Sequence, residues 1–125
     1  MLDHISIGVL DIARAKAFYD AALTPLGYRC LMEADGSLGY GNSSAGLWVS
    51  AVPSPVPPDE KSGLHICFQA PSRQSVDEFH RAALAAGGRD NGRPGLRPDY
   101  SDKYYAGFVV DPDGYRIEAH CDAPA

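Results

Sequence analysis

The sequence of 125 residues has no apolar run near the roughly 20 residues that a membrane-spanning helix needs. Its N-terminus, MLDHISIGVLD, lacks a basic segment and a long apolar core, so we expect no secretory signal. Basic residues are also scarce: 11 Lys and Arg stand singly against 16 Asp and Glu, a formal net charge of −5. Phosphate binding needs clustered basic residues. We therefore expect neither a membrane nor nucleic acid as a partner.

Cysteine is the next residue in short supply. Cys30, Cys67 and Cys121 are odd in number, widely spaced, and show no paired metal-ligand spacing. This usage favours reduced thiols in the cytoplasm over a disulfide framework. The apolar fraction of 45% and charged fraction of 22% are ordinary for a globular protein, and the length suits one domain.

An internal repeat organises the chain. The segment DHISIGVLDIARAKAFYDAALTPLG aligns without a gap on LHICFQAPSRQSVDEFHRAALAAGG, at a shift of 61 positions. Alanine matches are expected by chance, whereas matched histidine, phenylalanine and glycine in one register indicate a true repeat. The informative pairs are His4 with His65, Phe18 with Phe79, and Gly27 with Gly88.

Each copy predicts the same order of elements. A β-branched run is followed by a helix-capping residue, Asp11 or Ser72, and then by apolar residues at helical spacing. Glycines at 27 and 87–88 are placed to end the helices, and three strand-like segments follow. The predicted strands are 4–9, 28–33, 38–40 and 46–52 in the first copy, and 65–70, 89–93, 104–110 and 116–121 in the second.

The two copies predict an α+β fold of two paired βαβββ modules in a single domain, residues 1–125. Module one covers about 1–52 and module two about 63–122. A linker of about 53–62 holds four of the ten prolines, so it is expected to be stiff and extended. A single βαβββ unit leaves one sheet face exposed, so the modules must pair, either within the chain or between two chains.

Three side chains are candidate metal ligands. His4 and His65 occupy the same position in the two copies, and Glu118 lies in the last strand of the second. Two imidazoles and a carboxylate suit a divalent transition metal and leave open positions for substrate or water. In the repeat, Glu118 falls opposite Trp48, whose indole cannot ligate. Taken singly, each histidine is more often an ordinary surface or hydrogen-bonded residue.

The segments LDHISI, GLHICF and DPDGYRIEA resemble the three metal-ligand strands of the vicinal-oxygen-chelate superfamily, which includes glyoxalases, bleomycin-resistance proteins and ring-cleaving dioxygenases. The resemblance covers His4 to Cys121. It implies paired modules around Fe, Mn, Ni, Co or Zn held by His4, His65 and Glu118. It also implies that the metal binds a small oxygen-rich substrate through adjacent oxygens.

Departures from the family pattern reduce the number of family activities that fit this chain. Trp48 stands where glyoxalase I has a fourth ligand, which argues against that activity. The chain also lacks the second module pair of large ring-cleaving dioxygenases. A fosfomycin-resistance transferase needs cationic residues gathered around a phosphonate, and the few candidates here are Lys103, Arg97 and Arg116. The prediction is a metal-dependent lyase, isomerase, transferase or dioxygenase, and the family resemblance implies a homodimer. The alternative is a metal-free, small-molecule-binding protein of the bleomycin-resistance kind.

Arg97, Tyr104 and Tyr105 are the candidate catalytic residues. Arg97 is suited to hold a substrate carboxylate, and a tyrosine is suited to donate to an oxyanion. The alternative for the two tyrosines is packing on either side of a strand. The segment 97–105 is a candidate flap over the pocket, and no role is assigned to Cys67 or His120.

Overall fold

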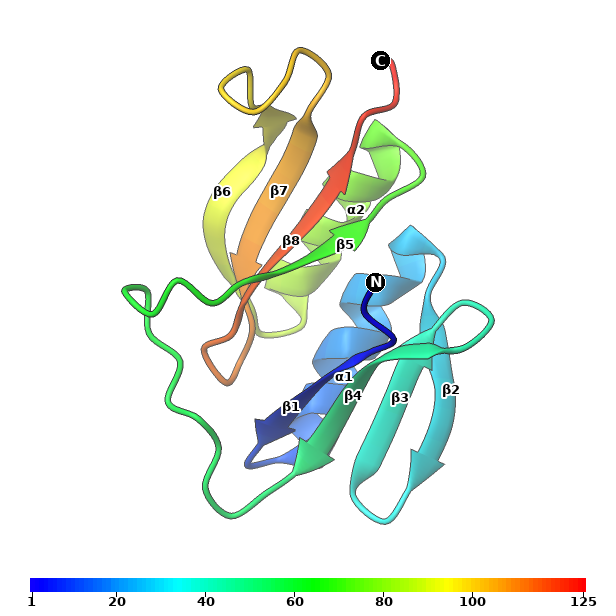
Figure 1. Cartoon of the computed structure of the whole chain (residues 1–125), viewed down its shortest axis with the longest axis vertical. Helices are drawn as coiled ribbons and strands as arrows, with labels where there is room; N and C mark the ends of the chain where they lie inside the picture. Colours follow the sequence, from blue (N-terminus) through cyan, green and yellow to red (C-terminus); the bar gives the residue numbers. More distant parts are fainter.

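Each half of the chain forms a four-stranded sheet with one helix against it (Figure 1). The structure is a computed structural model that describes all residues, 1–125. Module one contains β1 (Ile5–Val9), α1 (Ile12–Leu23), the 3-10 helix η1 (Thr24–Leu26), β2 (Arg29–Ala34), β3 (Ser37–Gly41) and β4 (Ala45–Ala51). Module two contains β5 (Ile66–Gln69), α2 (Arg73–Ala85), β6 (Arg89–Leu96), β7 (Tyr105–Val110) and β8 (Arg116–Cys121).

The two sheets have equivalent strand orders, β1-β4-β3-β2 and β5-β8-β7-β6. In each sheet the first and last strands of the module pair in parallel, and the remaining pairs are antiparallel. This confirms the predicted α+β fold of two βαβββ modules. Neither helix is long and apolar enough to cross a lipid bilayer.

The helices begin where the sequence predicts. The Asp11 side chain accepts from the backbone N–H of Arg14, and Ser72 forms a reciprocal capping box with Ser75. The end of α1 differs from the prediction, because regular α-helix stops before Gly27. Pro25 has no N–H to continue the helical ladder, so the chain passes through η1 before Gly27 adopts a φ of 89°.

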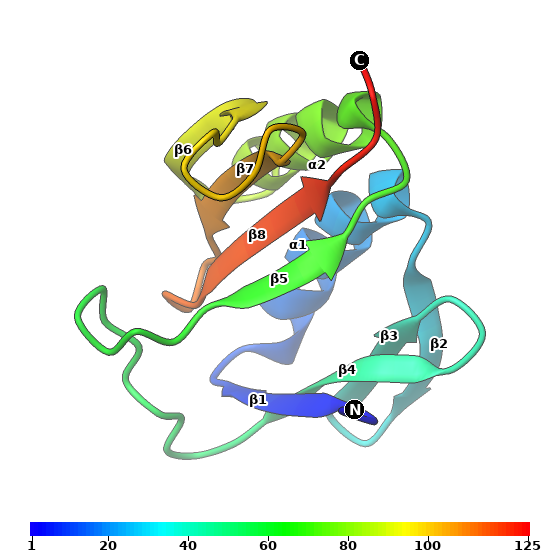
Figure 2. The same ribbon diagram turned by 45° about the horizontal axis from the view of Figure 1, so that its top comes forward.

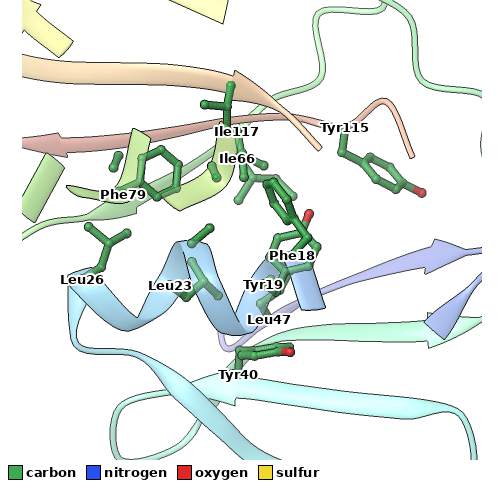
Figure 3. Close-up of a cluster of buried hydrophobic side chains, with 14 of the residues drawn as sticks. Phe18, Tyr19, Leu23, Leu26, Tyr40, Leu47, Ile66, Phe79, Tyr115 and Ile117 are labelled. Carbon is green, nitrogen blue, oxygen red and sulfur yellow. The ribbon is translucent and has the colours of Figure 1, made fainter. Parts of the chain in front are cut away.

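Both helices lie between the two sheets, and the modules share one hydrophobic core (Figure 2). Figure 3 shows α1 side chains such as Phe18 with Tyr40 and Leu47 of one sheet below them, and Ile66 and Ile117 of the other above. The helix-covered face of each sheet is therefore buried inside the chain. The opposite faces, called the open faces below, point away from each other.

The turn between β7 and β8 fastens module two to module one. Asp111 is buried and shapes this turn by accepting from the backbone N–H groups of Asp113 and Tyr115. Three side-chain contacts then cross to module one: Tyr19 Oη donates to Asp111 Oδ2 at 2.5 Å, Arg14 Nη2 to Asp113 Oδ1 at 2.8 Å, and Tyr115 Oη to the carbonyl of Gly8 at 2.6 Å.

Candidate functional site

Three predicted site residues meet on the open face of the second sheet. His65 Nε2 lies 3.0 Å from Glu118 Oε1, and Tyr104 Oη donates to Glu118 Oε2 at 2.6 Å. Both oxygens of the Glu118 carboxylate are thus bonded, and its side chain is only 3% accessible, against 48% for His65. The carboxylate is held in one orientation beneath an imidazole that reaches solvent.

Strand alternation explains why Glu118 faces this way. On β8 its neighbours Ile117 and Ala119 are buried in the core, so Glu118 points to the open face. Parallel pairing of β5 with β8 places Cys67 directly opposite Glu118. His65 precedes β5 by one residue and lies on the same face as Cys67.

The hydroxyl and the thiol beside Glu118 are both kept neutral. Burial, together with the hydrogen bond to Glu118, raises the pKa of Tyr104 above its ordinary value. Burial and the nearby Glu118 carboxylate raise the pKa of the Cys67 thiol to about 12. At neutral pH Tyr104 therefore remains a hydrogen-bond donor to Glu118, and Cys67 is not a thiolate nucleophile.

Aromatic packing positions Tyr104. Its ring stacks on the His120 imidazole with centroids 3.7 Å apart, and Tyr100 meets it edge-on at 4.9 Å. The loop between β6 and β7 is closed by a hydrogen bond from the backbone N–H of Arg97 to the carbonyl of Tyr104, at 2.7 Å. The segment considered as a flap is therefore the loop that holds Tyr104 over Glu118, and His120 supports the same ring.

The other two candidate catalytic residues do not join this cluster. Tyr105 lies on the helix side of the sheet, where its hydroxyl donates to Asp77 of α2 at 2.6 Å and its ring lies under the Arg73 guanidinium. Its neighbour Tyr104 faces the open side, so the pair packs on either side of the chain. Arg97 Cζ lies 5.2 Å from the centroid of the Phe108 ring.

His4 lies with the other module. Its Nδ1 is 2.6 Å from Asp3 Oδ1, and its side chain is 46% accessible. Within one chain, no group of three or more His, Cys, Asp or Glu side chains is placed to hold a metal ion. His4 and Cys67 do line one shared cavity of about 630 Å³, which lies between the two modules.

The first sheet has no acidic counterpart of Glu118. Trp48 pairs with Ser6 in the parallel β1–β4 ladder, just as Glu118 pairs with Cys67 in β5–β8. The Trp48 ring occupies the space above Gly39, where an added Cβ would come within 2.8 Å of it. The register therefore agrees with the equivalence of Trp48 and Glu118 in the repeat.

The donor chemistry of the His65–Glu118 pair fits a divalent transition metal. An imidazole nitrogen and a carboxylate oxygen already lie within 3.0 Å of each other, and Tyr104 orients the carboxylate by donating to its second oxygen. Such an outer hydrogen bond is a usual support for a metal-ligating carboxylate. One chain brings two of the three predicted ligands together, and the third, His4, is on the other sheet.

A second cavity next to His65 contains residues that the sequence pattern did not identify. It has a volume of about 130 Å³. Its lining is His65, Asn91, Tyr100, Phe108, Arg116 and Ile117. Asn91 could not be found from periodicity, because it lies at an irregularity in the β6–β7 register, between Asp90 and Gly92.

A family model described as the Glyoxalase/Bleomycin resistance protein/Dioxygenase superfamily matches residues 1–119. Among solved structures, a glyoxalase/bleomycin resistance protein from Albidiferax ferrireducens is similar, with 30% identity and a TM-score of 0.84. That alignment covers 96% of this chain and 98% of the other. No curated protein sequence matches the chain.

Two more distant structures share the fold. The fosfomycin resistance protein FosX from Listeria monocytogenes is 19% identical with a TM-score of 0.70, over 96% of this chain and 91% of that one. A glyoxalase I mutant from Zea mays is 19% identical with a TM-score of 0.68, over 95% of this chain and 45% of that one.

Proposed function

Because the chain belongs to the Glyoxalase/Bleomycin resistance protein/Dioxygenase superfamily, we propose that it is a divalent-metal-dependent enzyme acting on a small oxygen-rich molecule. The observation that carries this proposal is the arrangement of His65, Glu118 and Tyr104. A buried carboxylate bonded to an imidazole on one oxygen and to a neutral phenol on the other is a fixed and fully hydrogen-bonded arrangement. It is an effective one for presenting ligands.

In this proposal the metal is held by His65 and Glu118 of one chain and by His4 of a second copy. The helices lie between the sheets of one chain, and no group of three ligands forms there, so the two open faces do not meet at one metal site within the chain. Pairing the open face of module two with that of module one in a second copy supplies the missing imidazole. A homodimer formed in this way would contain two equivalent sites, related by its twofold axis.

When bound, a divalent metal would polarise the substrate oxygens and stabilise negative charge that develops on them. The side chains of this protein have separate tasks. His65 and Glu118 present the nitrogen and oxygen ligands, and Tyr104 fixes the carboxylate by donating to Oε2. Trp48 supplies no fourth ligand, so the reaction proposed is not that of glyoxalase I.

The test is elemental analysis of the untagged protein purified without chelators. The expected result is about one equivalent of Fe, Mn, Ni, Co or Zn per chain. His65→Ala should lose the metal while the far-UV circular dichroism stays unchanged. His80→Gln is the matched control, because His80 pairs with Asp90 on the helix side of the second sheet and should keep the metal.

The alternative is a metal-free small-molecule-binding protein of the same superfamily. It is favoured by one observation: within a single chain both Glu118 oxygens already have partners, and no three-ligand group is formed. Metal content near zero, before and after incubation with all five metals, would establish this alternative and overturn the enzyme proposal. Cationic and aromatic ligands would then be screened by the shift that they cause in the melting temperature of the protein.

A further inference from the structure

The cavity beside His65 has the composition of an anion-binding site. It is about 130 Å³, well below the roughly 300 Å³ at which drug-sized sites begin, so it suits one group of a ligand and not a whole ligand. Its lining residues include Arg116, Asn91 and Tyr100, whose side chains carry hydrogen-bond donors, and Phe108, whose ring is apolar. No aspartate or glutamate lines it.

Two guanidinium groups near this cavity have no carboxylate partner. Arg116 Nη1 donates to the backbone carbonyl of Glu60 at 2.5 Å, and none of the salt bridges in the chain includes Arg116. Arg97 donates to the carbonyls of Arg93 and Gly95. Carbonyl groups accept hydrogen bonds without cancelling the formal charge. In a chain of net charge −5, Arg116 thus lines the cavity, and Arg97 contacts the Phe108 ring that lines it, without a carboxylate partner for either.

The Glu118 carboxylate, which bonds to the cavity residue His65, is already engaged. Its two oxygens bond to His65 and Tyr104. Arg97 packs against the Phe108 ring, which lines the cavity, and so places a second positive charge near it. Neither Arg116 nor Arg97 is therefore hydrogen-bonded to a carboxylate of this chain.

We propose that this cavity binds a carboxylate group of the substrate, with Arg116 as its main partner and Asn91 and Tyr100 as further donors. The guanidinium fork matches a planar carboxylate, and the flanking Phe108 and Tyr100 rings suit a flat group attached to it. As a substrate subsite it rests on the proposed function, since His65 is shared between the cavity and the metal ligands. It specifies the substrate class as a small carboxylic acid with a planar carbon next to the carboxylate.

The proposal is tested by titrating the full chain with benzoate in the presence of a chelator, followed by backbone amide NMR. Benzoate should shift the amides of Asn91 and Arg116, whereas benzamide, its neutral counterpart, should not. Arg116→Gln should weaken benzoate binding by about tenfold or more, as expected for loss of a charge-assisted pair. Arg81→Gln removes the same charge from an exposed position on α2 and should bind like the wild type.

The same spectra show whether each variant is folded. If Arg116→Gln does not fold, Asn91→Ala takes its place and should weaken benzoate binding by several-fold. Equal binding of benzamide, or wild-type affinity in the Arg116 or Asn91 variant, would overturn the proposal. The variant Glu118→Gln separates this result from the proposed function: it should lose metal but keep benzoate binding, because Glu118 does not line the cavity.

Discussion

The two modules share strand order, helix caps and register, yet their open faces differ in chemistry. At equivalent places in the ladders, module one has Ser6 beside Trp48 and module two has Cys67 beside Glu118. The aromatic residue of this pair also stands on a different strand in each module. In module one Trp48 on β4 pairs with Gly39 on β3, whereas in module two Glu118 on β8 pairs with Phe108 on β7. In the proposed site, module one thus contributes His4, and module two contributes His65 and Glu118 together with the supporting Tyr104.

This comparison shows how a repeat can diverge without changing its fold. The helix-facing residues of both sheets build a common core, so substitutions there would disturb packing in both modules. The open-face residues Ser6, Trp48, Cys67 and Glu118 are not part of this core cluster, so their chemistry can change without altering it. The functional asymmetry therefore lies where the structural constraint is weakest.

The largest expected effect separates Glu118 from its counterpart in module one. Glu118→Gln removes a charged ligand and should lower metal affinity by about 100-fold or more, because second-shell changes alone cost about 10–100-fold. Trp48→Phe should leave metal affinity within about twofold of the wild type. Competition with a metallochromic chelator measures both. An equal loss in the two variants would mean that the modules contribute alike.

The next prediction distinguishes the two neighbouring tyrosines. Tyr104→Phe removes the donor to Glu118 Oε2, so metal affinity should fall by about 10-fold. Tyr105→Phe removes a hydrogen bond to Asp77 on the helix side and should not change metal affinity. Titration calorimetry with the metal found in the wild type would measure the difference. Comparable effects would contradict the assignment of Tyr104 as a positioning residue.

A smaller effect concerns the contact that fastens the modules together. Tyr19→Phe leaves the buried Asp111 carboxylate without its phenol donor, and should reduce the free energy of unfolding by about 1–3 kcal/mol. Tyr40→Phe is the control inside module one, because its partner Asp20 is half-exposed and water can replace the hydroxyl. Urea denaturation should show the larger loss for Tyr19→Phe. A larger loss for Tyr40→Phe would show that the contact between the modules stabilises the protein no more than a contact within module one.

The smallest predicted effect is a pH dependence. Burial raises the pKa of Asp111 above its ordinary value, because the charged form is penalised in the core. A carboxyl with a raised folded-state pKa binds its proton more tightly in the folded state. Its contribution is therefore fully present below the unfolded pKa and is lost as pH rises through the folded pKa. The melting temperature of the wild type should accordingly rise, relative to Asp111→Asn, on acidification from neutral pH toward pH 4.

The sequence predicted much of the fold, for identifiable reasons. Alternating apolar residues, the capping side chains of Asp11 and Ser72, and the repeat itself specify local structure, and local structure determines each βαβββ module. The end of α1 was placed too late, because Pro25 interrupts the helix before Gly27. The placement of both helices between the sheets depends on long-range packing that periodicity does not encode.

Prediction of the site was more uneven. His65 and Glu118 could be paired because the repeat and the strand faces both placed them on one surface. The separation of Tyr104 from Tyr105 follows from simple alternation, but which of them faces Glu118 depends on the loop that precedes β7. Asn91 was missed because the irregular register of β6 breaks the alternation on which sequence reasoning relies.

The central claim is that each metal site takes His4 from one chain and His65 with Glu118 from another. It is tested most directly by metal analysis of a mixed dimer that contains one His4→Ala chain and one His65→Ala chain, isolated with two different affinity tags. Neither variant should bind metal alone. The mixed dimer should bind about one metal ion, because one of its two sites has all three ligands. No metal in the mixed dimer, alongside full metal in the wild type, would contradict the claim.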